Sequence, residues 1–100
     1  MLFMNSEKIG LSIITPSKDV NPAAFEETAN SVLTVMEPDW EWIIIVHNSK
    51  PEAAEQIRRL TGNHPGVTVY VKKDEIYSPA SPRNTGIHLA KGKYLYFLDH

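Results

Sequence analysis

Runs of β-forming residues alternate with segments of helical pattern along this chain, and that alternation restricts its fold more than any other feature. The pattern predicts three helices between four strands, which are Leu11–Thr15, Trp40–Val46, Val67–Val71 and Tyr94–Leu98. Strands separated by single helices pair in parallel, because each helix returns the chain to the starting edge of the sheet. The sequence therefore predicts an α/β domain, Rossmann-like and three-layered, with a mostly parallel four-stranded sheet.

The expected layout of the sheet follows from the handedness of the connections. Right-handed crossovers favour the strand order 3-2-1-4, with the first two helices on one face and the third helix on the other. The winding then reverses between the first and fourth strands, and open α/β sheets bind ligands at the carboxyl ends of such strands. The carboxyl end of the first strand carries Thr15, Pro16 and Ser17, and that of the fourth carries Asp99. We expect these residues to flank a common crevice.

Residues that start or stop helices mark the element boundaries. The expected boundary residues are Asn21 and Pro38 for the first helix, Ser49 with Glu52 as a capping box for the second, and Ser81 and Gly92 for the third. The run Tyr94–Leu98 that follows is apolar and aromatic throughout, which is typical of a strand buried on both faces.

Length and composition bound the class of protein. The 100 residues suffice for one small domain, and we expect residues 1–10 to be a disordered or tag-like tail and residues 11–100 to form the domain. A net charge of −2 argues against a nucleic-acid partner bound by phosphate neutralisation, and no apolar run is long enough to form a transmembrane segment. The chain has no cysteine, which excludes thiolate metal sites and fits a cytoplasmic, reducing compartment.

Three segments resemble one known family. They are Leu11–Asp19, Pro38–Val46 and Pro82–Asp99. The third is long and specific, because it resembles an Ala-Arg-Asn-x-Gly helix followed by the strand that leads into an Asp-x-Asp motif. Together the three segments resemble the N-terminal half of the family 2 glycosyltransferases, which are inverting nucleotide-sugar enzymes of the GT-A fold. The resemblance implies that residues 11–100 form the nucleotide-sugar-binding half of such a domain.

The resemblance also implies a site for a nucleotide diphosphate sugar. In that family the first loop and the end of the second strand hold the nucleotide, the arginine of the third segment lies near the donor phosphates, and the Asp-x-Asp motif binds a divalent metal and the diphosphate. The implied substrate-binding residues are Thr15, Pro16, Ser17, His47, Asn48, Arg83 and Asp99, with Asp99 also the implied ligand of Mn²⁺ or Mg²⁺. Hard carboxylate oxygens suit either cation, and the cation neutralises the diphosphate as it leaves.

Two departures from the family pattern bear on the donor. His47 and Asn48 stand where the family usually has two aspartates, and Lys18 replaces a residue that is usually aromatic or small and polar. The donor sugar, its nucleotide and the acceptor therefore stay open. The inverting mechanism needs a carboxylate base to deprotonate the acceptor hydroxyl. No residue of this chain is assigned that role, so we expect the 100-residue chain alone to be inactive.

Other interpretations stand beside these. The chain could be a non-catalytic α/β module for interaction or assembly that has lost donor binding, because both aspartates are replaced. Asp99 could simply cap its strand, and Arg83 could pair with Asp74 or Glu75. Gly86 lies inside a predicted helix, where glycine costs about 1 kcal/mol relative to alanine. It could serve close packing of that helix on the sheet or the approach of a ligand.

The last strand also predicts self-association. In the order 3-2-1-4 the run Tyr94–Leu98 is an edge strand, although its composition is that of an interior one. Exposed apolar edges pair readily with other chains. We therefore expect a homo-dimer, or a larger species, that forms through this edge.

Overall fold

The predicted order of helices and strands is confirmed by the computed structural model, which describes residues 9–18, 21–47, 49–73 and 80–99. The elements in chain order are β1 (Ile9–Ser17), α1 (Pro22–Val35), β2 (Trp40–His47), α2 (Pro51–Leu60), β3 (Val67–Lys72), α3 (Ala80–Leu89) and β4 (Gly92–Phe97). The tail expected over residues 1–10 falls mostly on residues 1–8, which lie outside the described residues.

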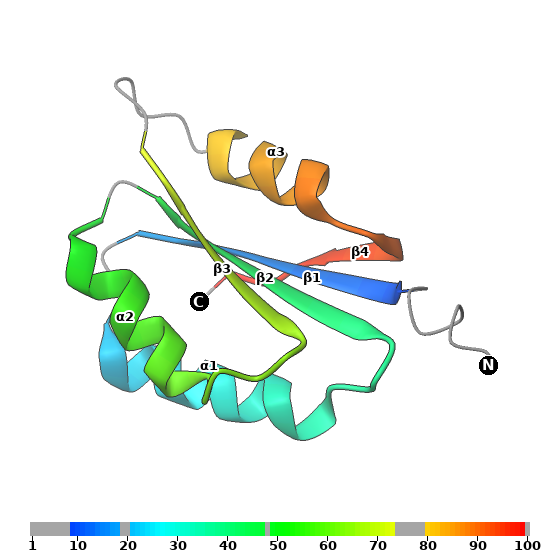
Figure 1. Cartoon of the computed structure of the whole chain (residues 1–100), viewed down its shortest axis with the longest axis horizontal. Helices are drawn as coiled ribbons and strands as arrows, with labels where there is room; N and C mark the ends of the chain where they lie inside the picture. The colour runs from blue at the N-terminus through cyan, green and yellow to red at the C-terminus, as the bar shows by residue number, and fades with distance from the viewer. Residues whose placement is uncertain (1–8, 19–20, 48, 74–79, 100) are drawn as a thin grey trace.

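The sheet has the predicted order. Its four strands run β3-β2-β1-β4, and every neighbouring pair is parallel. Helices α1 and α2 cover one face, while α3 lies on the other (Figure 1). The chain is therefore a Rossmann-like α/β domain of three layers, and all four strands end at the same edge of the sheet.

The core lies between the two central strands and the helices on both faces. In β2 the run Trp42–Val46 is almost completely buried, and the Trp42 ring stacks on Phe25 of α1 with centroids 5.8 Å apart. On the opposite face α3 packs closely on β1, because Gly86 has no side chain. A Cβ atom at Gly86 would overlap Cγ2 of Ile14. The packing role considered for this glycine is therefore the one that the structure supports.

Helix α1 begins and ends close to the predicted residues. The Asn21 side-chain oxygen accepts hydrogen bonds from the backbone N–H groups of Ala23 and Ala24, at 3.1 and 3.2 Å, and Pro22 occupies the first helical position. This arrangement satisfies N–H groups that have no partner within the helix. The helix ends at Val35, three residues before Pro38.

Three of the predicted boundary residues act differently. The Ser49–Glu52 capping box is wrong, because α2 begins at Pro51 after Lys50, and the Ser49 hydroxyl donates to the His47 carbonyl at 3.2 Å. Helix α3 begins at Ala80, one residue before the expected cap Ser81. Gly92 does not follow the helix end directly. It starts β4, and its N–H donates to the Ser12 hydroxyl at 2.8 Å.

Strand β1 is longer than predicted at both ends. It starts at Ile9, inside the expected tail, and the Gly10 N–H donates to the Asp39 carbonyl at 2.7 Å. It also continues through Pro16. The Leu98 N–H donates to the Ile14 carbonyl, so Ile14 and, by alternation, Pro16 direct their backbone groups toward β4. The missing N–H of Pro16 is therefore on the β4 side, where the pairing stops level with Ile14, and β1 still pairs with β2 through Ser17.

The prediction that the run Tyr94–Leu98 is buried is wrong, and the prediction that it lies at the edge is confirmed. Among the residues that the structure describes, strand β4 pairs with β1 alone, and α3 packs mainly on β1 and β2. The exposed fractions in β4 are 63% for Tyr94, 43% for Leu95, 55% for Tyr96 and 40% for Phe97. A large apolar surface is therefore left open along this edge.

Candidate functional site

Polar residues from all four strands meet at the carboxyl edge of the sheet. Ser17 ends β1, His47 ends β2 and Lys72 ends β3, with His47 level with Lys72 in the strand pairing. Asp99 follows β4 by two residues. Phe97 is level with Ile14, so Asp99 comes level with the end of β1. The structure thus brings the end of the first strand and the last carboxylate to one edge, and the crevice expected between them stays a prediction.

Arg83 and Asp99 form an ion pair at this edge. The Arg83 Nη2 atom donates to Oδ2 of Asp99 at 3.1 Å. The two side chains are 41% and 64% exposed, so solvent and a ligand can reach both. The two residues that the resemblance assigned to the donor phosphates and to the metal therefore touch each other. Asp74 and Glu75, the other partners considered for Arg83, lie outside the described residues.

Thr15 is fixed beneath the edge rather than on its surface. Its hydroxyl accepts a hydrogen bond from the indole N–H of Trp42 at 2.8 Å, and both residues are fully buried. Pro16 is half-buried and Ser17 is buried. The bond ties Thr15, near the end of β1, to Trp42, near the start of the neighbouring strand β2. We had not predicted it, although a buried tryptophan generally needs an acceptor for its N–H.

His47, the last residue of β2, is one of the two residues that stand where the family usually has aspartates. The His47 side chain is buried, at 1% exposed, at the carboxyl edge between β1 and β3. Its carbonyl accepts the hydrogen bond from Ser49. Asn48, the second residue of the pair, lies outside the described residues. His47 is therefore at the predicted position, with a side chain enclosed by the protein.

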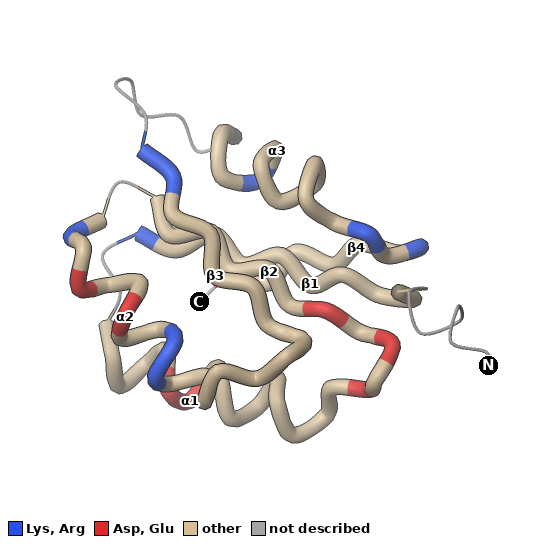
Figure 2. Tube along the Cα trace, viewed as in Figure 1, with Lys and Arg blue, Asp and Glu red and all other residues tan. Residues whose placement is uncertain are grey.

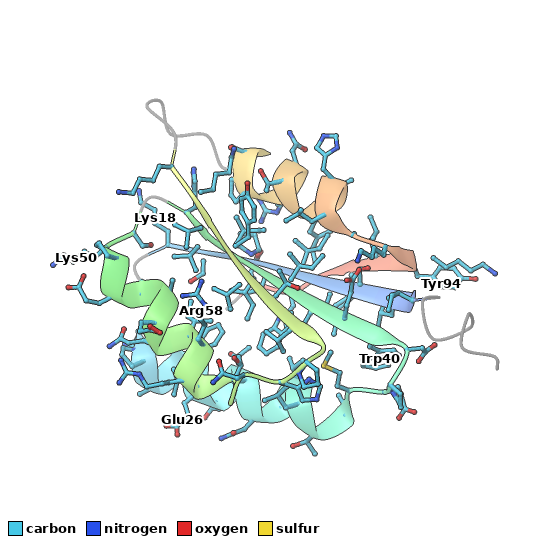
Figure 3. The ribbon with its side chains drawn as sticks, viewed as in Figure 1. Lys18, Glu26, Trp40, Lys50, Arg58 and Tyr94 are labelled. Atoms are coloured by element: carbon cyan, nitrogen blue, oxygen red, sulfur yellow. The ribbon has the colours of Figure 1, made fainter. Side chains whose placement is uncertain are left out.

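Charge is distributed unevenly along the sheet. Lys72 and Lys73 at the end of β3 lie at the same end of the molecule as Lys18 and Lys50 (Figures 2 and 3). The acidic residues between α1 and the start of β2 lie at the opposite, amino edge (Figure 2). A group of cations beside a site attracts anionic ligands, which fits a phosphate-bearing substrate.

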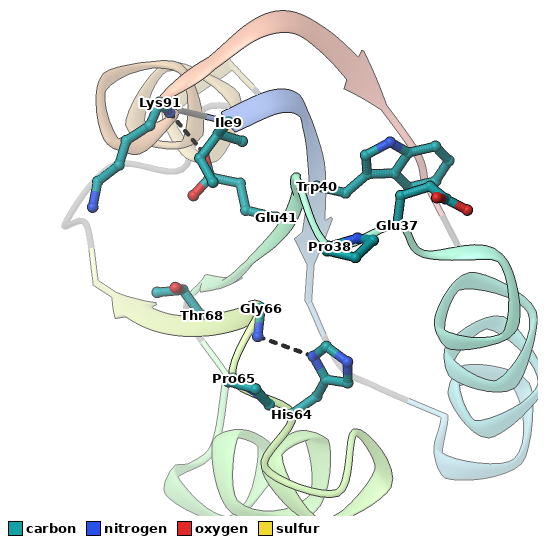
Figure 4. A pocket seen from close by; sticks show the side chains of 10 residues that line it. All are labelled: Ile9, Glu37, Pro38, Trp40, Glu41, His64, Pro65, Gly66, Thr68 and Lys91. Carbon is teal, nitrogen blue, oxygen red and sulfur yellow. Dashed lines mark hydrogen bonds between the residues drawn. The ribbon is translucent and has the colours of Figure 1, made fainter. Parts of the chain in front are cut away.

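A hollow of about 840 Å³ lies at the amino edge, away from these residues. Its lining includes Glu41, Lys91 and His64 (Figure 4). Glu41 Oε2 accepts hydrogen bonds from the Ser12 hydroxyl at 2.5 Å and from the Lys91 N–H at 2.7 Å. These bonds tie the turn before β4 to β1 and β2. Since Glu41 is engaged in this way and no predicted site residue lines the hollow, we assign this edge a structural role.

Asp99 is the residue to which the resemblance assigns a metal ion. Among the described residues, no three His, Cys, Asp or Glu side chains lie close enough together to hold one. Oxygen atoms of substrate phosphates commonly complete the coordination of Mg²⁺ beside one or two carboxylates, so the carboxylate of Asp99 suits such an arrangement. Within the same described part of the chain, no helix is both long and apolar enough to cross a membrane.

Comparisons with known proteins identify the family. The sequence profile described as Glycosyl transferase family 2 matches residues 12–100. A solved structure with the same fold is the mannosyltransferase PcManGT from Pyrobaculum calidifontis in complex with GDP-Man and Mn²⁺, with a TM-score of 0.67 and 17% identity. The match covers 92% of this chain and 27% of that one, so this chain spans about a quarter of its neighbour. A search of curated proteins gave no match. The profile match covers most of the sequence, and the chain therefore belongs to family 2 of the glycosyltransferases, with a sheet of the GT-A type.

Proposed function

We propose that the carboxyl edge binds the nucleotide diphosphate sugar from which the full protein transfers a sugar to an acceptor. The observation that carries this proposal is the exposed Arg83–Asp99 ion pair level with the end of β1, where the winding of the sheet reverses. A guanidinium can bind a phosphate through two hydrogen bonds. A carboxylate beside it can share a cation with the same phosphate.

The residues divide into groups with different tasks. Pro16, Ser17 and His47 would border the base and ribose. Asn48, to which the resemblance gives the same task, lies outside the described residues. Thr15 acts through its position, because its hydroxyl is already bonded to Trp42. On donor binding, Arg83 would turn from Asp99 toward the diphosphate. The nearby lysines of the carboxyl edge would add to the attraction for the anion without defining its geometry.

A divalent cation, Mn²⁺ or Mg²⁺, would bind at the site together with the donor. Asp99 offers one accessible carboxylate, and the donor phosphates would supply further oxygens. When bound, the cation would neutralise charge that builds up on the departing diphosphate. The structural neighbour was solved with GDP-Man and Mn²⁺, which supports this choice of partners. Asp99 would hold the cation against the diphosphate, and Arg83 would bind the phosphate oxygens that the cation leaves open.

Transfer with inversion needs an acceptor hydroxyl that attacks the sugar carbon in line with the departing diphosphate, while a carboxylate base takes the hydroxyl proton. None of the described residues is assigned as that base. We therefore expect the 100-residue chain to bind donor without transferring sugar. The alternative function is an assembly module that does not bind donor, and the exposed side chains of strand β4 favour it. A measurement of donor binding distinguishes the two hypotheses.

Titration calorimetry with GDP and with UDP, each with and without Mn²⁺, tests the proposal. We expect one of the nucleotides to bind, and to bind more tightly with Mn²⁺. Hydrogen bonds to charged groups contribute about 1.5–3 kcal/mol, so Asp99→Asn and Arg83→Met should each weaken binding by roughly tenfold to a hundredfold. The matched control is Asp39→Asn, which changes an exposed aspartate at the amino edge. Equal affinities for Asp99→Asn and the unchanged chain would contradict the proposed site, and no heat with either nucleotide would favour the assembly module.

A further inference from the structure

A serine of β1 and a glutamate of β2 hold the turn between α3 and β4. The Ser12 hydroxyl is fully buried; it accepts a hydrogen bond from the Gly92 N–H at 2.8 Å and donates one to Oε2 of Glu41 at 2.5 Å. The same carboxylate oxygen accepts a hydrogen bond from the Lys91 N–H at 2.7 Å. One oxygen atom of Glu41 therefore connects β2 both to β1 and to the residues that lead into β4.

The close approach of this turn to β1 depends on glycine. A Cβ atom at Gly92 would lie 2.5 Å from the Ser12 hydroxyl oxygen and 2.6 Å from the Ser12 backbone nitrogen, which is closer than real Cβ atoms come. Without a side chain, the Gly92 backbone reaches the buried hydroxyl. These contacts fix where β4 begins to pair with β1, and the parallel ladder continues from there as far as Ile14 and Phe97.

The two elements that meet at this turn carry the ion pair at the opposite edge of the sheet. Arg83 lies near the start of α3, and Asp99 follows the end of β4. Between the turn and the ion pair, α3 touches β1 where Gly86 packs on Ile14. Ser12 and Ile14 lie on the same face of β1, because side chains alternate along a strand. The turn, the glycine contact and the ion pair therefore follow one another along the face that α3 covers.

We propose that Glu41 is a positioning residue for the Arg83–Asp99 pair and, through this pair, for the binding of the donor. Asp99 follows Gly92 by seven residues, which is about 23 Å of extended chain. A slip of β4 by one residue would turn Asp99 to the other face of the sheet, and a slip by two would move it by about 7 Å. Either change would separate Asp99 from Arg83. The part that concerns the donor rests on the function proposed above.

The sharing of one oxygen by two hydrogen bonds determines which variants test the proposal. Glu41→Gln keeps a carbonyl oxygen that can accept both bonds, so it should behave like the unchanged chain. Glu41→Leu has a similar volume but leaves the Ser12 hydroxyl and the Lys91 N–H without their common acceptor. The matched control is Thr61→Val, which removes another buried hydroxyl, one that donates to carbonyl groups of α2 on the opposite face of the sheet.

Amide hydrogen exchange measures the effect on β4 without any ligand. The Leu98 N–H is next to Asp99 and donates to the Ile14 carbonyl at 2.9 Å. In Glu41→Leu we expect this amide to exchange on the order of tenfold faster relative to the amides of the β2–β3 ladder. In Glu41→Gln and in Thr61→Val the relative rate should stay unchanged. An unchanged relative rate in Glu41→Leu would overturn the proposal, and an equal acceleration in Glu41→Gln would overturn the role of the shared oxygen.

Titration calorimetry with GDP or UDP and Mn²⁺ then measures the effect on the donor site. Glu41→Leu should weaken nucleotide binding by about threefold to tenfold, while Glu41→Gln and Thr61→Val should bind like the unchanged chain. Equal affinities for Glu41→Leu and the unchanged chain would overturn the link between Glu41 and the donor. If the unchanged chain bound neither nucleotide, the proposed function would fail, and the exchange rate of Leu98 would still decide whether Glu41 positions the end of β4.

Discussion

Replacement of Gly86 by alanine should destabilise the protein, although alanine is the better helix former. An ordinary Gly→Ala change inside an exposed helix stabilises by about 1 kcal/mol. Here the added Cβ would overlap Cγ2 of Ile14 and lie 3.4 Å from Cβ and Cδ1 of the same residue. Ile14 is fully buried in the central strand β1, and its branched side chain is stiff. The methyl group cannot move aside without displacing α3 or β1.

The magnitude follows from two opposing terms. Extra volume in a packed core costs about 1–3 kcal/mol, and the helix propensity returns about 1 kcal/mol. We therefore expect Gly86→Ala to lower the free energy of unfolding by up to about 2 kcal/mol. Ile14→Leu removes the branched methyl and alone should cost less than about 1.5 kcal/mol. In the double variant the overlap is relieved, so the two changes should couple favourably by about 1 kcal/mol or more.

Urea unfolding of the four proteins in this cycle provides the measurement. The exposed Asn84 on the same helix gives a matched control, because Asn84→Ala should stabilise by a few tenths of a kcal/mol through helix propensity alone. Replacement of an exposed helical glycine by alanine stabilises a protein. If Gly86→Ala stabilised this protein to the same extent, α3 could not lie as close to β1 as the structure shows. Purely additive effects in the cycle would contradict the assignment of the overlap to Ile14.

Three further predictions use the same unfolding assay. Gly92→Ala should cost about 1–3 kcal/mol, because its Cβ would lie 2.6 Å from the backbone nitrogen of Ser12, which cannot rotate away; an unchanged midpoint would contradict this contact. Thr15→Val should cost about 1–3 kcal/mol, since it leaves the buried indole N–H of Trp42 without its acceptor; a neutral effect would mean that the bond does not form. Asp99→Asn should change stability by less than about 1 kcal/mol, because its ion pair is exposed. A larger loss would indicate a structural rather than a ligand-binding carboxylate.

The sequence predicted the layers and the strand order because periodicity and the rule for right-handed crossovers act locally. Pro38 and Asn21 marked the ends of α1 through the backbone conformations that they favour or forbid. Pro16 did not end β1, although the predicted strand stops at Thr15. The N–H that proline lacks faces β4, so the pairing of β1 with β2 continues through Ser17. The Ser49–Glu52 signal failed because Pro51, at the first helical position, moved the cap to Lys50.

The site was predicted in its position more fully than in its contacts. Parallel strands place the residues at their carboxyl ends on one edge of the sheet. The order of helices and strands was therefore enough to predict that Thr15 and Asp99 lie at the same edge. The Arg83–Asp99 pair and the bond from Trp42 to Thr15 depend on side-chain geometry across strands. The cations at the ends of β1 and β3 are separated by more than 50 residues in the chain, and only the sheet brings them to one edge.

Paramagnetic broadening of backbone amide signals by Mn²⁺, in the presence of a nucleoside diphosphate, tests the central claim most directly. We expect the signals of Ser17, Arg83 and Asp99 at the carboxyl edge to broaden when nucleotide and Mn²⁺ are present together, and to remain sharp with Mn²⁺ alone at the same concentration. Broadening centred instead on the hollow around Glu41 and His64, or spread evenly over the chain, would contradict a nucleotide and metal site at this edge.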